Sequence, residues 1–206
     1  MHRFAAVAAV LCAFAIVSPA GGQAAVGDCA GADVIRSPQD AHSFERSTLC
    51  LLNAQRSSAG LRALSTRPVL SRAAAGYSAQ MVRESFFAHR DLAGRLARAG
   101  YLSHATTDWL VGENLGWATG TLATPRQLVA AWMASPGHRR NILEPAFRDI
   151  GIGVAAGTPS SGPDGVTVTT EFGARRIRAR VRRGSRVRRG SRQLHAPALA
   201  LRSSPT

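Results

Sequence analysis

The chain contains no lysine, and all 26 of its basic residues are arginines. It has no second long apolar run after the one at its start, which argues against a membrane-spanning segment in an exported chain. The pattern His-Glu-x-x-His, typical of a large class of zinc proteases, is also absent. These absences argue against an integral membrane protein and against a protease of that class.

The first 25 residues have the three parts of a secretory signal peptide. A charged start is followed by an unbroken apolar run from Phe4 to Val17, and then by small residues that suit a cleavage site. The apolar run is shorter than the ~20 residues that a helix needs to cross a bilayer. We therefore predict a signal peptide at residues 1–25 and a mature protein that is secreted or associated with the cell envelope.

Removal of this segment leaves two of the three cysteines, Cys29 and Cys50. Thiols tend to pair in an oxidising compartment, so we predict a disulfide between them. It would tether a leader of residues 26–45 to the first helix, and a loop of this length is worth roughly 3 kcal/mol in the chain-entropy account. Two unpaired thiols or a shared metal ion are the alternatives.

Positive charge is concentrated at the C-terminal end. Eleven arginines and no acid lie from residue 175 onward, whereas residues 26–174 hold fourteen arginines and twelve acids. Dense like charge with little to bury is typical of disorder, so we predict a disordered tail at 175–206. The tail could bind an anionic cell-surface polymer or acidic lipid head groups. Export argues against a nucleic-acid target.

Between leader and tail, the apolar spacing predicts a single domain of helices followed by strands. Pro68 and Pro125 suit the first turn of a helix, and Gly60 suits the end of one. The later segments alternate in the manner of strands. We expect helices at 43–59, 68–85, 92–99 and 125–134, strands at 150–155 and 166–172, and a third strand within 109–117. This order predicts an α+β fold with a small central sheet.

Three short blocks carry side chains that can bind a metal or move a proton. His89 follows Phe86 and Phe87, Glu113 lies between Gly112 and Asn114, and His138 follows Ser135-Pro136-Gly137. Two imidazoles and one carboxylate on separate segments could form a partial metal or acid/base site. Each residue also has a structural interpretation, as a helix-end contact, a satisfied buried carboxylate or a packed turn residue.

These blocks and their order resemble the bacterial branch of the CAP superfamily, the SCP-like extracellular proteins. The resemblance covers residues 46–174 and rests on six segments: Leu52–Arg56, His89, Gly112–Asn114, Trp132–Leu143, Gly151–Val154 and Phe172–Gly173. It implies an α-β-α sandwich with an open cleft that presents two histidines and two glutamates.

By this resemblance, His89, Glu113 and His138 line the cleft. The second glutamate of the family has no counterpart in Met133–Ser135. His89 and His138 are candidate ligands for a divalent metal such as zinc, but two histidines without a third protein ligand bind metal weakly.

The sequence leaves three functions open. The first is a secreted module that binds a small or lipid-like ligand in the cleft. The second is a metal-assisted hydrolase, directed at peptides or the cell wall, in which Glu113 is the general base. The third is a cell-surface protein that adheres through its arginine-rich tail.

Overall fold

The computed structural model describes residues 29–35, 40–160 and 162–178. Within these ranges the helices are α1 (Ala41–Ser58), α2 (Pro68–Arg83), α3 (Leu92–Arg98), the short 3-10 helix η2 (Gly120–Leu122), α4 (Pro125–Ala134) and α5 (Pro136–Ile142). The strands are β1 (Ser65–Thr66), β2 (Thr106–Ala118), β3 (Asp149–Thr158) and β4 (Gly162–Ile177).

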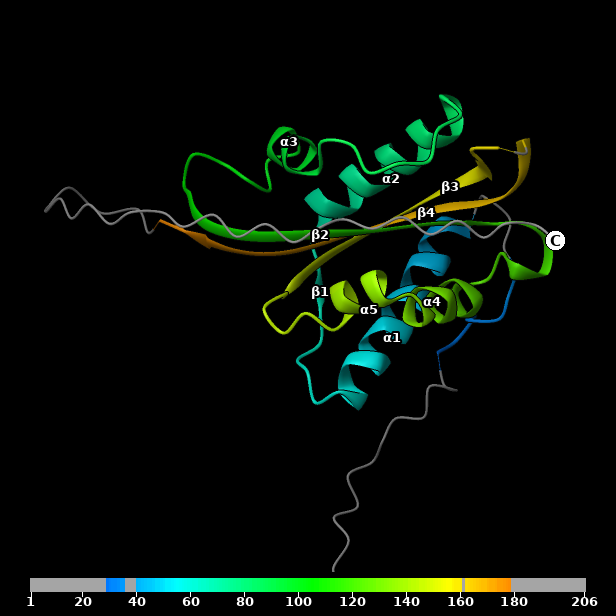
Figure 1. The fold of residues 1–206 in the computed structure, drawn as a ribbon, viewed down its shortest axis with the longest axis horizontal. Helices are drawn as coiled ribbons and strands as arrows, with labels where there is room; N and C mark the ends of the chain where they lie inside the picture. Colours follow the sequence, from blue (N-terminus) through cyan, green and yellow to red (C-terminus); the bar gives the residue numbers. More distant parts are fainter. Residues whose placement is uncertain (1–28, 36–39, 161, 179–206) are drawn as a thin grey trace, which may run out of the picture.

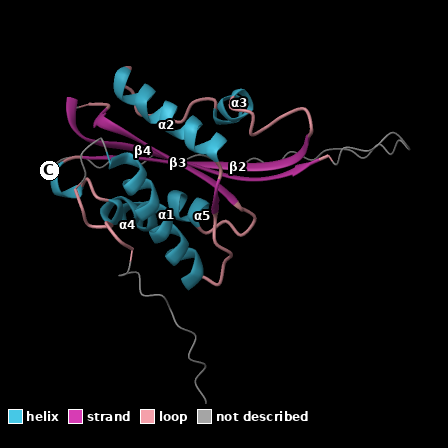
Figure 2. Ribbon diagram, turned by 180° about the vertical axis from the view of Figure 1, so that it is seen from behind, coloured by secondary structure: helices cyan, strands magenta, loops and turns pink. Residues whose placement is uncertain are grey.

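The elements form an α-β-α sandwich. Helices α2 and α3 cover one face of the sheet, and α1, α4 and α5 cover the other (Figure 1). The view from behind shows the same three layers (Figure 2). The predicted α+β class and its layer arrangement are therefore confirmed.

The sheet has the strand order β1-β3-β4-β2, so β2 lies at one edge. Strand β4 is antiparallel to both of its neighbours, and β1 pairs with β3 in the parallel direction. The long ladder between β2 and β4 places Glu113 directly opposite Glu171. Because side chains alternate between the two faces of a strand, this pair points toward the same layer of helices.

The residues that were expected to begin or end helices do lie at helix ends. Pro68 and Pro125 each lie in the first turn of their helix, and the side chain of Thr124 accepts a hydrogen bond from the backbone of Gln127 at 3.2 Å. Gly60, just after α1, has φ +69°, a conformation that glycine adopts without strain. These local signals fix the ends of the helices that flank the site.

The largest apolar cluster lies between the sheet and the layer of α1, α4 and α5. Trp132 is fully buried there, and its indole donates to the carbonyl of Leu115 at 2.9 Å. On the other face, α2 lies so close to β3 that a Cβ added at Gly151 or Gly153 would overlap the helix backbone. Both faces of the sheet are therefore tightly covered.

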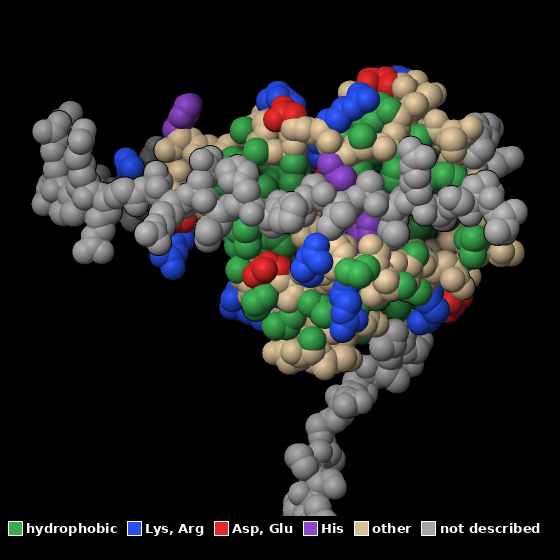
Figure 3. Space-filling view, in the orientation of Figure 1, with side chains coloured by type: hydrophobic (Ala, Val, Ile, Leu, Met, Phe, Trp, Pro, Cys, Tyr) green, Lys and Arg blue, Asp and Glu red, His purple; other side chains and the backbone are tan. Residues whose placement is uncertain are grey.

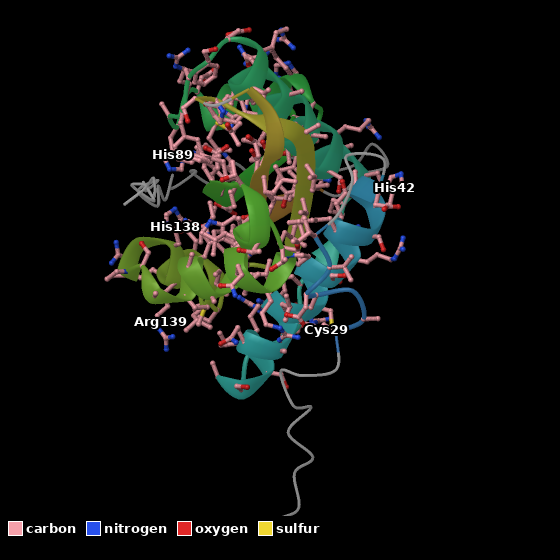
Figure 4. All side chains as sticks on the ribbon, turned by 90° about the vertical axis from the view of Figure 1, so that its right-hand side faces the viewer. Cys29, His42, His89, His138 and Arg139 are labelled. Carbon is pink, nitrogen blue, oxygen red and sulfur yellow. A yellow bond between two sulfur atoms is a disulfide. The ribbon has the colours of Figure 1, made fainter. Side chains whose placement is uncertain are left out.

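The predicted disulfide is confirmed. Cys29 and Cys50 are joined, with their Cα atoms 5.7 Å apart. The segment around Cys29 is held further by the Ser47 hydroxyl, which donates to Ala30 O at 2.6 Å, and by a two-point ion pair of Arg126 with Asp33 at 2.6 and 2.9 Å. The bridge and these contacts attach the leader to α1 and α4, and Figure 4 shows Cys29 beside the first of these helices.

Three boundaries differ from the prediction. The leader was assigned to residues 26–45, but α1 begins at Ala41. The helix expected at 125–134 ends where predicted, but a further helix, α5, follows at once, because Ser135 is extended (ψ 121°) and proline fits the first turn of the next helix. Strand β4 runs through Ile177, since residues 175–177 pair with β2, so they belong to the sheet and not to the tail.

Several predictions fall outside the described residues. They are the signal peptide at 1–25 and the tail from 179 to 206. Among the described residues, no helix combines the length and the apolar character needed to span a bilayer.

Candidate functional site

The loop after α2 carries His89 and is held in place by aromatic contacts. The Tyr77 hydroxyl donates a 2.5 Å hydrogen bond to the carbonyl of Ala88, the residue before His89. The ring of Phe86 packs edge-on against Tyr77, and the guanidinium of Arg90 lies 3.8 Å above the Phe86 ring. The residues on both sides of His89 are thus fixed to α2.

His89 and Glu113 are in direct contact. Nδ1 of His89 lies 2.7 Å from Oε1 of Glu113, which is fully buried in β2. The His89 side chain keeps 15% of its surface exposed, while its Nε2 atom is buried and has no hydrogen-bond partner among the described residues. Glu113 therefore orients the ring, because a carboxylate that accepts from Nδ1–H fixes the tautomer with its acceptor at Nε2.

Arg95 holds the second oxygen of the same carboxylate. Asp91, whose side chain accepts from the backbone of Gly94 at 3.1 Å, begins α3 and so directs Arg95 inward. The guanidinium stacks 3.4 Å above the ring of Tyr77 and donates to Oε2 of Glu113 and to the carbonyl of Arg90. Both oxygens of Glu113 are therefore engaged by protein groups.

A second carboxylate lies beside this cluster. Glu171, opposite Glu113 on β4, is fully buried, and its Oε1 lies 3.6 Å from Nη2 of Arg95. Neither of its oxygens has a hydrogen-bond partner in the described part of the chain. Burial raises the pKa of Glu171 from 4.5 to about 8; the charge of Arg95 opposes this rise and that of Glu113 adds to it. A pKa raised in this way favours the protonated form of Glu171 at neutral pH.

His138 comes from the opposite layer. It is buried in the first turn of α5, where its Nδ1 lies 3.0 Å from the hydroxyl of Ser135 and its carbonyl accepts from the side chain of Asn114 at 3.2 Å. Asn141 of the same helix donates to the carbonyl of Glu113 at 3.0 Å. Helix α5 is thus fastened to β2 at the residues that carry the site.

Figure 4 shows His89 and His138 on the same side of the molecule, one in each helical layer. The structure joins His89 directly to Glu113, whereas it joins His138 to the adjacent residue of β2 through its backbone. The three candidate residues therefore come from the loop after α2, from β2 and from α5, and each histidine contacts β2 from a different layer.

The metal prediction can be compared with the available donors. The buried Nε2 of His89 is a suitable donor for zinc, and the ring of His138 would have to be the second. In the part of the chain that the structure describes, no group of three or more His, Cys, Asp or Glu side chains is arranged to hold a metal ion. The donors present fit a weakly held ion at most.

Sequence reasoning missed Tyr77, Arg95 and Glu171. A signal for Glu171 exists, because it is an acid on an otherwise uncharged strand segment between Val166 and Phe172. Arg95 lies on a helix at a position where the apolar spacing alone predicts an ordinary surface residue. Tyr77 lies on the apolar stripe of its helix, where the spacing alone predicts an ordinary core residue.

Comparisons with known proteins agree with this architecture. A model of the cysteine-rich secretory protein family (CAP) matches residues 49–172. The uncharacterized protein YkwD of Bacillus subtilis (strain 168) is 34% identical over 117 residues, which cover 57% of this chain and 44% of YkwD. The crystal structure of an extracellular SCP-domain protein from Bacillus anthracis aligns with a TM-score of 0.51 and 23% identity, over 69% of this chain and 44% of that one.

The chain spans less than half the length of both relatives, so their similarity concerns one domain. The structural match supports the fold, and the family model covers more than half of the chain, including His89, Glu113 and His138. The chain therefore belongs to the cysteine-rich secretory protein (CAP) family.

Proposed function

We propose that this protein is an extracellular binding module whose site at His89, Glu113 and His138 takes a small or lipid-like ligand. The observation that carries the proposal is the buried Nε2 of His89, which has no hydrogen-bond partner within residues 29–35, 40–160 and 162–178, while Nδ1 is fixed by Glu113. Leaving a buried polar atom unsatisfied costs about 1–3 kcal/mol. A ligand that donates to this nitrogen would recover that free energy.

The proposed location outside the cell has two supports. The first residues have the pattern of a secretory signal peptide. The Bacillus anthracis relative is described as an extracellular protein. The disulfide is compatible with such a location, because disulfides persist in oxidising compartments.

The predicted divalent ion, with zinc as the natural choice, would be held by His89 and His138. With two imidazoles as protein ligands, the ion would exchange readily and would leave coordination positions for a ligand or water. Glu113 would act on it only through His89, since both oxygens of Glu113 are engaged by His89 and Arg95.

Calorimetric titration of the mature protein with zinc chloride and with a fatty acid tests the site. We expect saturable binding of at least one probe, weakened tenfold or more in His89→Ala and in His138→Ala. His42→Ala is the matched control, because His42 is 93% exposed on α1. Unchanged affinity in both site variants, or equal loss in the control, would contradict the proposal.

The second candidate is the hydrolase, and the geometry changes its assignment of roles. A histidine whose Nδ1 is held by a carboxylate, with Nε2 available, is the arrangement of a general base and its orienting group. Glu113 is fully buried with both oxygens occupied, so His89 is the better base and Glu113 the group that positions it.

A screen of peptide, ester and cell-wall substrates separates the two candidates. The hydrolase requires turnover that His89→Gln abolishes and that Glu113→Gln lowers with a changed pH profile. The binding module requires that the same variants change ligand affinity without any turnover in the parent protein. Activity that persists in His89→Gln would remove this site from the reaction.

A further inference from the structure

Arg95 of α3 reaches into the site at His89, although it belongs to none of the sequence blocks that were expected to form it. Its side chain is only 11% exposed. The guanidinium contacts four parts of the fold, which are α2, the loop after α2, β2 and β4. One side chain therefore connects every element that surrounds His89 on this face of the sheet.

The contact with β2 fixes the carboxylate that holds the imidazole ring. Nη2 of Arg95 donates to Oε2 of Glu113, while Oε1 of the same carboxylate lies 2.7 Å from Nδ1 of His89. The last torsion of a glutamate side chain is broad, so a hydrogen bond to one oxygen alone leaves the carboxylate free to turn. Because Arg95 engages the second oxygen, Oε1 stays in place for Nδ1.

The contact with the loop holds the backbone that carries His89. Nη1 of Arg95 donates to the carbonyl of Arg90, the residue after His89. The carbonyl of Ala88, the residue before it, accepts from the Tyr77 hydroxyl at 2.5 Å, and the Arg95 guanidinium lies 3.4 Å above the Tyr77 ring. The backbone is thus held on both sides of the histidine, directly or indirectly by Arg95.

Arg95 serves Glu113 rather than the carboxyl group opposite it. Glu171 lies across the β2–β4 ladder on the same face of the sheet, and its Oε1 is 3.6 Å from Nη2 of Arg95, which is beyond hydrogen-bond distance. The donors of a guanidinium form a rigid planar fork. Its stacking on Tyr77 and its bond to the Arg90 carbonyl set the direction of that fork, and the remaining donor meets Glu113.

Only the histidine end of this arrangement is close to solvent. Glu113 and Glu171 are fully buried, whereas the side chain of His89 keeps 15% of its surface exposed. Figure 3 shows histidine side chains at the surface near the middle of one face of the domain. In the part of the chain that the structure describes, no group hydrogen-bonds Nε2 of His89. A ligand would therefore meet the ring at this nitrogen.

We propose that Arg95 is a positioning residue of the ligand site. Through Glu113 and the Arg90 carbonyl, its guanidinium keeps His89 in the tautomer that carries the proton on Nδ1 and presents Nε2 as an acceptor. Such a nitrogen suits a ligand hydroxyl group or a divalent ion. The use of this tautomer in binding rests on the proposed function, but the arrangement itself exists without a ligand.

NMR spectra of the imidazole nitrogens in the isotope-labelled mature protein test the proposal without any ligand, because protonated and unprotonated ring nitrogens differ in chemical shift. We expect His89 of the parent to favour the Nδ1–H tautomer by about tenfold or more, since hydrogen bonds to charged groups are among the stronger ones. In Arg95→Lys, which keeps the charge but loses the planar fork, the preference should fall to about threefold or less.

Arg98→Lys is the matched control. Arg98 lies on the same helix with its side chain 68% exposed, and it pairs with Asp91 at the surface. Its replacement should leave the His89 tautomer as in the parent. Arg95→Met, which removes the charge as well, should lower the preference at least as far as Arg95→Lys. If that variant does not fold, Arg95→Lys decides the matter, because it leaves a positive charge beside the buried carboxyl groups.

Two results would overturn the proposal. The first is an unchanged tautomer preference in Arg95→Lys, and the second is an equal fall in Arg98→Lys. Titration of the same proteins with zinc chloride and with a long-chain alcohol separates this role from the proposed function. A tautomer that depends on Arg95 in a parent protein that binds neither probe supports the positioning role and counts against the binding function alone.

Discussion

Glu113 and Glu171 face each other across the ladder between β2 and β4, and both carboxyl groups are fully buried. Arg95 lies between them, donating to Glu113 and remaining 3.6 Å from Glu171. One guanidinium cannot neutralise two buried carboxylates, so a proton on one of the two carboxyl groups balances the charge of Arg95, Glu113 and Glu171 when His89 is neutral. Glu171 is that residue, because its pKa is raised to about 8 mainly by burial.

This raised pKa predicts a pH dependence of stability. Between pH 4.5 and about 8, the folded state holds a proton on Glu171 that the unfolded chain releases, so the free energy of unfolding falls as pH rises. The slope from this one group is about 1.4 kcal/mol per pH unit at most. Glu171→Gln, which keeps a neutral side chain of similar size, should remove this decline.

Urea unfolding of the parent and of Glu171→Gln at pH 5 and pH 8 measures the effect. The two proteins should be closest in stability at pH 5, with the variant the more stable by several kcal/mol at pH 8. Glu84→Gln is the control, because Glu84 is 42% exposed and should behave as the parent does. Parallel pH profiles for the parent and Glu171→Gln would show that Glu171 is ionised in the folded protein.

Arg56 is a second buried charge whose loss should be costly. It is fully buried in α1 and donates to the carbonyls of Arg62, Ile142, Glu144 and Phe147 at 2.8 to 3.3 Å. Arg56→Met would remove this donor from all four carbonyls, and only that of Phe147 keeps a second side-chain donor among the hydrogen bonds described here, from Nη1 of Arg148 at 2.8 Å, which predicts a destabilisation of about 3 kcal/mol or more. Arg46→Met on the exposed face of the same helix should cost little, and equal effects in denaturant melts would count against this account.

Gly153 tests the contact between β3 and α2. A Cβ at this position would overlap the backbone of Ala74 and Ala75, so Gly153→Ala should destabilise the fold by about 1–3 kcal/mol or more. Gly76→Ala is the matched comparison on α2, because nothing lies within 4 Å of its added Cβ and alanine is the better helix former. It should stabilise by about 0.5–1 kcal/mol. Thermal melts that rank the two variants in the opposite order would refute the close approach.

Local signals predicted much of this fold. Pro68, Thr124 and Pro125 act within one turn of their helices, and their effects do not depend on the rest of the chain. The two-residue strand β1 could not be predicted in this way, because it is defined by its pairing with β3 more than 80 residues later. Helix α5 was missed because a proline that ends one helix also suits the first turn of the next.

In the candidate site, too, the local features could be predicted from sequence and the long-range contacts could not. His89 and Glu113 belong to short blocks with visible chemistry, and the structure brings them into contact. The roles of Arg95 and Glu171 follow from the register of β2 against β4 and from the placement of α3 over Tyr77, and both are long-range relationships. A single sequence shows that an arginine and a glutamate are present, but it does not show that Arg95 lies beside Glu113 and Glu171.

The covalent link between Cys29 and Cys50 also determines what a protease can release from this domain. Cleavage at any peptide bond between the two cysteines would open the loop while both fragments stay attached through sulfur. A nicked molecule would migrate as a single species under non-reducing conditions and separate only after thiol treatment. The N-terminal segment would thus remain with the sandwich after damage that would detach an unbridged leader.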